Sequence, residues 1–257
     1  IMLKHLSMQS AVSQIAKTNK ILQVIENFQN ENLKSVLVKG LICRLTYPQP
    51  ELRTSGDEDL HIDGNDFLRY HNMLMDMGFE SDEDISEELY ELKGEASYSD
   101  KISSLVIELH RDDIPGEIKK SKKGEAFFED AFKNPVKQKV GNTAIDVLSP
   151  TAHLTYLVLH ARKHFLINGF GIRQALDIII FTKAYSNEID FEKYGQLLDE
   201  YSAKKFAGAI YAMRPILGLE KEEYFPKAEA QIKYIDPKDM LEDILAGGIY
   251  GDESLAH

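Results

Sequence analysis

Apolar side chains recur with two different periods along the first 148 residues of the chain. In residues 8–30 they fall three, four and seven positions apart, which predicts an amphipathic helix. The apolar positions of this helix are Val12, Ile15, Leu22, Ile25 and Phe28. Residues 35–40 and 105–109 are instead short, continuous runs rich in valine, isoleucine and leucine, which predict buried strands. Residues 57–62 alternate between polar and apolar positions in a strand-like way.

Several shorter segments complete the mixed first part. Residues 41–47 predict a helix that Pro48 ends, because proline disfavours helical backbone in the residue before it. The apolar positions of residues 67–77 have helical period and stop at a glycine. We also predict short strands near residues 89–92 and 142–148.

The pattern changes at Ser149, which can cap a helix that begins at Pro150. From there apolar residues keep helical spacing only. The predicted helices cover about residues 150–165, 172–185, 191–201 and 204–216. We therefore predict an α+β (α/β) protein, with a mixed sheet and flanking helices over residues 1–148, including the N-terminal helix, and a helical domain over residues 149–257.

Charge narrows the classes of ligand. The 257 residues contain 42 acidic and 30 basic residues, which gives a net charge of −12. A surface of this sign repels duplex DNA, so we expect no DNA partner. A small nucleotide held through a divalent cation is compatible with it, because the cation reverses the local sign.

Composition also bears on the cellular setting. Cys43 is the single cysteine, so the chain cannot form an internal disulfide. The apolar runs are far shorter than a membrane span, and the first residues lack the pattern of a signal peptide. We expect a cytoplasmic protein with no membrane partner.

Three carboxylates carry the strongest chemical signal. On a strand, Asp57 and Asp59 project to the same side while Glu58 points away. Glu108 lies within the apolar run 105–109, where a buried carboxylate is costly unless it is paired or bound to a cation. Together they would form an oxygen cage suited to Mg²⁺ or Mn²⁺. Two alternatives stay open: an Asp-x-Asp pair arises often by chance in an acidic chain, and Glu108 can face solvent at a sheet edge.

The order of these residues resembles a known family. The motifs that carry the likeness are Lys39-Gly40, Tyr47-Pro48-x-Pro50, Arg53-x-Ser55-Gly56-Asp57-x-Asp59-Leu60, Ile107-Glu108-Leu109-His110, Leu148-Ser149-Pro150, Lys163-His164 and Ile172-Arg173-x-x-x-x-Asp177. Over roughly residues 33–220 they are similar to the uncharacterised bacterial nucleotidyltransferase family of the polymerase-β-like superfamily.

This resemblance implies a function. The chain would have a minimal nucleotidyltransferase sheet followed by a helical domain. Asp57, Asp59 and Glu108 would bind the catalytic Mg²⁺ or Mn²⁺, and Glu108 would help to deprotonate an acceptor hydroxyl. The reaction would move a nucleoside monophosphate from an NTP such as ATP to the acceptor and release pyrophosphate.

The resemblance also implies a nucleotide-binding set. Gly40 would lie beside the phosphates, with Lys39 or Arg53 as counter-charges. The other residues of this set are Ser55, Gly56, Lys163 and Arg173. For Arg173, the alternative is an ion pair with Asp177 four residues later.

Other interpretations stay open beside this one. His160 and His164 have the helical spacing of a zinc-chelating pair, although packing is the simpler role. The whole chain can also be a catalytically inactive module of the same fold that senses nucleotides or binds a partner, as an antitoxin does. The acceptor and the base of the nucleotide are not encoded in residue spacing.

Overall fold

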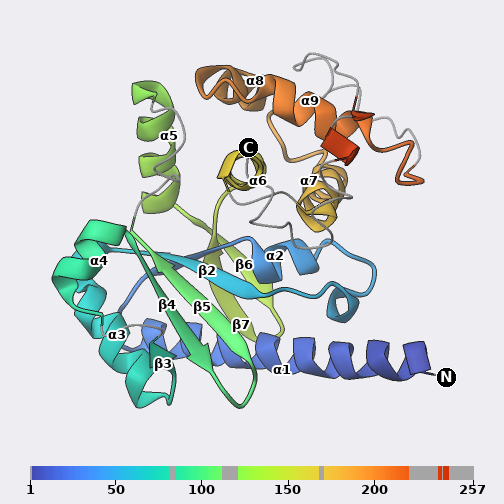
Figure 1. The fold of residues 1–257 in the computed structure, drawn as a ribbon. Coiled ribbons are helices and arrows are strands. Elements are labelled where there is room, and N and C mark those ends of the chain that lie inside the picture. Colours follow the sequence, from blue (N-terminus) through green and yellow to red (C-terminus); the bar gives the residue numbers. More distant parts are fainter. Residues whose placement is uncertain are drawn as a thin grey trace. The chain divides into compact units, whose positions relative to one another are not determined.

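The computed structural model describes residues 2–81, 85–111, 121–167, 171–219, 237–238 and 240–242 (Figure 1). The chain divides into two compact units. The first contains residues 1–113 and 134–148, and the second contains residues 114–133 and 149–257. The division of the chain into domains of residues 1–148 and 149–257 stays a prediction. The compact units differ from it because they place the helix of residues 122–133 with the later helices.

The strands of the first unit form one mixed, seven-stranded sheet in the order β3-β4-β5-β2-β1-β7-β6. The strands are β1 (Ser35–Val38), β2 (Asp57–Ile62), β3 (Glu80–Ser81), β4 (Glu95–Asp100), β5 (Leu105–His110), β6 (Val136–Val140) and β7 (Thr143–Val147). Strand β2 runs antiparallel to β1 on one side and parallel to β5 on the other. The sheet therefore holds the two strands that carry the predicted carboxylates next to each other.

Four helices and two short 3₁₀ segments accompany the sheet in the described part of the first unit. They are α1 (Met2–Asn30), α2 (Gly40–Arg44), η1 (Pro50–Leu52), η2 (Gly64–Asp66), α3 (Phe67–Asp76) and α4 (Glu87–Lys93). The long helix α1 runs along the sheet and contacts β5 and β7 (Figure 1). Helix α2 begins at Gly40, directly after β1, as a strand-to-helix turn requires.

One strand prediction for the first unit is wrong, and some elements were missed. Residues 89–92 lie in helix α4, because Ser86 caps the helix by accepting a hydrogen bond from the Leu89 amide (3.2 Å), and Gly94 ends it in a left-handed conformation. Strands β3, β4 and β6 of the first unit and helix α5 (Lys122–Lys133) of the second unit were not predicted.

The buried face of α1 is also different from the predicted one. Val12 and Ile15 are 66% and 51% exposed, whereas Gln14 and Lys17 are buried at the same end of the helix. The reason is that both polar side chains reach the Ser55 carbonyl, so their burial costs little. Further along α1 the buried face is apolar, as predicted for Ile25 and Phe28.

The described part of the second unit is helical. Its helices are α5, α6 (Pro150–Ile167), α7 (Ile172–Ala184), α8 (Phe191–Glu200) and α9 (Lys204–Ala212). Helix α6 is buried on all sides over its first turns and contacts α7, α8 and α9, so it is the central helix of this unit. No helix among the described residues has the length and apolar content needed to cross a bilayer.

The buried His153 of α6 gives a testable acid sensitivity. Its side chain is 1% exposed, its ring centroid lies 5.0 Å from that of Phe181, and burial lowers its pKa to about 3. Below pH 6.5 the unfolded chain binds a proton here that the folded chain does not, so stability falls as the pH falls from 6.5 towards 3. At pH 5.5 the expected cost is about 1.4 kcal/mol.

The measurement is urea unfolding from pH 7.5 to pH 4.5 for the parent and for His153→Phe, which keeps a ring of similar size. The loss of stability on acidification should be smaller in His153→Phe. Parallel pH curves for the two proteins would contradict a neutral, desolvated His153.

Candidate active site

One face of the sheet gathers polar side chains from β2 and β5. Asp57 and Asp59 project to this face of β2, and Glu108 and His110 project to the same face of β5 because residues two apart on a strand share a side. The parallel register pairs Asp59 directly with Glu108. The alternate residues of β5, Leu105, Ile107 and Leu109, are completely buried on the other face. Asp59 and Glu108, which are 49 positions apart in the chain, thus become neighbours.

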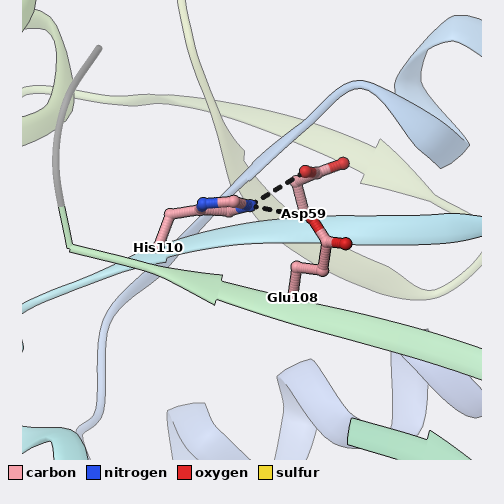
Figure 2. A group of neighbouring side chains, drawn as sticks. All are labelled: Asp59, Glu108 and His110. Carbon is pink, nitrogen blue, oxygen red and sulfur yellow. Dashed lines mark hydrogen bonds and ion pairs between the residues drawn. The ribbon is translucent and has the colours of Figure 1, made fainter. Parts of the chain in front are cut away.

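Asp59, Glu108 and His110 converge on one point (Figure 2). His110 Nε2 lies 3.0 Å from Asp59 Oδ1 and 3.3 Å from Glu108 Oε2. Each of the three residues offers a possible metal-ligand atom, and these atoms lie within 4.8 Å of one another. Asp59 is fully buried, whereas Glu108 and His110 are partly accessible.

Lys39 brings a positive charge to the same carboxylates. It lies one residue after Val38, which is paired with Asp59 in the sheet. Its ammonium nitrogen lies 2.8 Å from Asp59 Oδ1 and 3.9 Å from Asp57 Oδ2. Lys39 and Gly40 both have positive φ angles, of 62° and 35°, so the chain turns sharply here to enter α2.

These contacts fix the charge states of Glu108 and His110. The hydrogen bond with His110 is the main cause that lowers the pKa of Glu108, and the charge of Lys39 adds to it, against the opposing effect of burial. Burial lowers the pKa of His110, but hydrogen bonds to Asp59 and Glu108 outweigh it and raise the pKa to about 9. At neutral pH, Glu108 is therefore ionised and His110 is protonated.

The site has the properties of a cation site. Among the described residues, the second carboxylate oxygen of Asp59, Oδ2, is buried without a hydrogen-bond partner. A buried carboxylate oxygen without a donor is costly, and a divalent cation would remove that cost. The three neighbouring side chains supply oxygen and imidazole donors, which are ordinary ligands of divalent metals in proteins. The residues present therefore fit the metal that the sequence motifs imply.

Glu58 lies on the opposite, buried face of β2 and organises the turn into α2. Its side chain is fully buried. Glu58 Oε1 lies 2.6 Å from Arg44 Nη1, and Glu58 Oε2 accepts a hydrogen bond from the Leu41 amide at 2.7 Å. A Cβ atom on Gly40 would lie 2.0 Å from Glu58 Oε2, so the carboxylate fills the space that a side chain at position 40 would need.

Ser55 connects this ion pair to α1. Its hydroxyl bonds to Arg44 and lies 3.3 Å from Glu58 Oε1. The Ser55 amide donates to Gln14 Oε1 at 3.3 Å, and its carbonyl accepts from Lys17 Nζ at 3.2 Å. This network holds the loop that leads into Asp57 from behind the sheet. The sequence contains only a weak signal for this network. That signal is the presence of Gln14 and Lys17, two polar residues three positions apart, on an otherwise apolar face of α1.

The structure thus brings part of the predicted site together. Asp59 and Glu108 meet at His110, and Asp57 and Lys39 lie beside them. His110 was not predicted as a site residue, although its position two residues after Glu108 on a strand would have indicated it.

The other predicted nucleotide-binding residues have roles that stay predictions. Gly40 begins α2, Gly56 directly precedes Asp57, and Arg53 directly follows η1. Ser55 bonds within the network behind the sheet, as described above. Lys163 and Arg173 lie on α6 and α7 in the second unit.

The predicted histidine pair of α6 is also close in space. His160 Nε2 and His164 Nε2 lie 3.3 Å apart. Within the described residues, no third metal-ligating side chain joins them. The zinc interpretation of this pair therefore lacks the ligands of a complete site.

The comparisons with known proteins define the class. The family model described as uncharacterised nucleotidyltransferase matches residues 2–215, so the chain belongs to this family of nucleotidyltransferases. Comparison with curated protein sequences gives no match.

Solved structures similar to this chain include the following two. One is the antibiotic-resistance factor ANT(2'')-Ia, with 13% identity, a TM-score of 0.46, and coverage of 80% of this chain and 96% of its own. The other is an antigenic nucleotidyltransferase-like protein from Paracoccidioides brasiliensis, with 14% identity, a TM-score of 0.48, and coverage of 85% and 94%.

Proposed function

We propose that this nucleotidyltransferase is metal-dependent and moves a nucleoside monophosphate from an NTP to an acceptor hydroxyl. The observation that carries the proposal is the convergence of Asp59, Glu108 and His110, beside a buried Asp59 oxygen that has no hydrogen-bond partner among the described residues. Asp57, Asp59 and Glu108 would hold the divalent cation. When bound, the cation would neutralise the triphosphate and stabilise the charge that develops during transfer.

The side chains of this face have distinct roles in the proposed reaction. Lys39 places its ammonium group beside Asp57 and Asp59, where it can pair with phosphate oxygens. Glu108 is ionised at neutral pH, so it is competent to accept a proton. The acceptor oxygen would bond to the α-phosphorus, the bond from that phosphorus to the β-phosphate oxygen would break, and the hydroxyl proton would pass to Glu108. Pyrophosphate would leave.

Buried contacts behind the sheet would keep this arrangement rigid. Glu58 fixes the Leu41 amide and Arg44, and the Ser55 network fixes the loop before Asp57. A site whose side chains are already in place pays little reorganisation during the reaction. We therefore assign Glu58 and Ser55 to positioning.

The test is transfer of label from each of four NTPs, radiolabelled at the α-phosphate, to acceptors in a fractionated cell extract with Mg²⁺ or Mn²⁺. The parent should transfer label and release pyrophosphate, and Asp57→Asn should do neither. The matched control is Asp76→Asn, which makes the same change at an exposed position of α3 and should behave like the parent. Metal-dependent NTP binding without transfer to any fraction would instead favour the inactive binding module.

A further inference from the structure

We propose that His110 is a direct ligand of the cation, so that the site is a mixed oxygen and nitrogen centre that takes Mn²⁺ in preference to Mg²⁺. This inference rests on the proposed function, because it specifies the cation of the same site. It concerns a residue that the predicted carboxylate cage did not include.

The strand geometry directs His110 into the site. Glu108 and His110 share one face of β5, and His110 Nε2 is the ring atom that faces both carboxylates. Figure 2 shows the imidazole reaching from β5 to Asp59 on β2. Its Nε2 atom thus occupies the position of a third ligand beside two carboxylate oxygens.

The other ring nitrogen also faces a carboxylate. Glu95 on β4 is paired in register with His110, and Glu95 Oε2 lies 3.8 Å from His110 Nδ1. A histidine that binds a metal through one nitrogen commonly directs its other N–H at a carboxylate, which fixes the tautomer and strengthens the ligand. At this distance the contact is an ion pair, and the charge of Glu95 would favour the tautomer that carries its proton on Nδ1 and leaves Nε2 for the metal.

A second observation points to a cation at the same place. Asp59 is fully buried and, within the described residues, its Oδ2 atom has no hydrogen-bond partner. Both Lys39 and His110 approach the other oxygen, Oδ1. An ammonium group has no lone pair to offer a metal, whereas a neutral imidazole has one. A bound cation would take the place of the Nε2 proton, since histidine ligates in its neutral form.

The donor set decides the preference between cations. Mg²⁺ favours oxygen ligands and loses its water reluctantly. Mn²⁺ accepts the same carboxylates and also binds imidazole nitrogen. Its affinity for such ligands is lower than that of the later transition metals. Two carboxylates and one imidazole therefore favour Mn²⁺ over Mg²⁺, while three carboxylates alone would not distinguish them in this way.

The experiment measures metal binding directly. Mn²⁺ binding to the parent is followed by electron paramagnetic resonance, and electron spin-echo modulation detects nitrogen bonded to the ion. Mg²⁺ affinity is obtained by competition. We expect imidazole nitrogen coupling in the parent and an affinity for Mn²⁺ at least about tenfold higher than for Mg²⁺. His110→Asn should abolish the coupling and lower Mn²⁺ affinity about tenfold, with Mg²⁺ affinity changed less than about twofold.

Two control proteins locate the nitrogen. His71→Gln removes a histidine of α3 whose Nδ1 atom contacts the Tyr98 hydroxyl (2.9 Å), and it should leave the coupling intact. The double variant His160→Asn/His164→Asn removes the histidine pair of α6 and should also leave it intact. Circular dichroism checks that each variant is folded, and the measurement on the parent stands even if His110→Asn is not.

The outcomes separate this inference from the proposed function. Mn²⁺ binding that requires Asp59 but shows no nitrogen coupling in the parent overturns the His110 assignment and leaves the transferase proposal standing. Coupling that disappears in the α6 double variant overturns it as well. Coupling from His110 in a protein that transfers no nucleotide supports the inference and counts against the transferase. Absence of any Mn²⁺ or Mg²⁺ binding to the parent overturns both.

Discussion

Asp59→Asn is expected to lower nucleotide transfer about 10³-fold while the protein stays folded. The substitution keeps the size of the side chain but removes the charge that faces Lys39 and His110 and the oxygen that has no partner within the described residues. Loss of one electrostatic contact to reacting groups costs about 10²–10³ in rate, and loss of a metal ligand adds to that cost. The measurement is kcat/KM for pyrophosphate release at saturating Mn²⁺ and at saturating Mg²⁺.

Asp100→Asn is the control for the burial of the substituted residue. Asp100 on β4 is 4% exposed and accepts a hydrogen bond from the Ser103 amide at 2.7 Å, in contacts separate from those of the candidate site. Its replacement should lower stability but leave kcat/KM close to that of the parent. If both variants lose transfer equally, or if Asp59→Asn stays within about tenfold of the parent, Asp59 does not carry the role proposed for it.

Breaking the Arg44–Glu58 pair is expected to have the largest effect on stability. Both side chains are almost completely buried, so either single replacement leaves an uncompensated charge in the interior. Arg44→Met and Glu58→Leu should each lower the free energy of unfolding by about 3–5 kcal/mol. The double variant should cost much less than the sum of the two, because it removes both charges together.

Urea unfolding of the parent, the two single variants and the double variant gives this interaction energy as a double-mutant cycle. Lys101→Met is the matched control, since it breaks the pair between Lys101 and Glu80 on the surface, and it should leave the unfolding midpoint nearly unchanged. If the double variant loses as much stability as the two single variants together, Arg44 and Glu58 contribute to stability independently of each other.

The sequence predicted the carboxylates of the candidate site for a sound physical reason. Because a strand has a period of two, Asp57 and Asp59 must share a side and Glu58 must point away, and the structure confirms this alternation. Strands β1 and β5 were predicted because short apolar, β-branched runs are typical of buried strands, and β2 was predicted from its alternation. Strand β7 was expected only as a short strand near residues 142–148. The family assignment is confirmed as well, since it depends on the order of motifs along the chain.

The wrong and missed elements have local or tertiary causes. Residues 89–92 were predicted as a strand from their leucines, but they form helix α4 because the cap at Ser86 is the stronger signal. The exposed Val12 and Ile15 of α1 show that apolar spacing alone does not say which helix face meets the sheet. That choice depends on Ser55, which accepts hydrogen bonds from Gln14 and Lys17 across about forty residues of sequence.

The sequence by itself determined strands β1, β2, β5 and β7, the side of β2 on which Asp57 and Asp59 lie, and the class of the protein. Only the tertiary structure decided that β5 lies parallel to β2 in the register that sets Glu108 beside Asp59. The same register brings His110 to both carboxylates, and the antiparallel register of β4 with β5 brings Glu95 to His110. The physical reason is that periodicity is a property of neighbours along the chain, whereas strand order and register depend on how the whole sheet buries its apolar face.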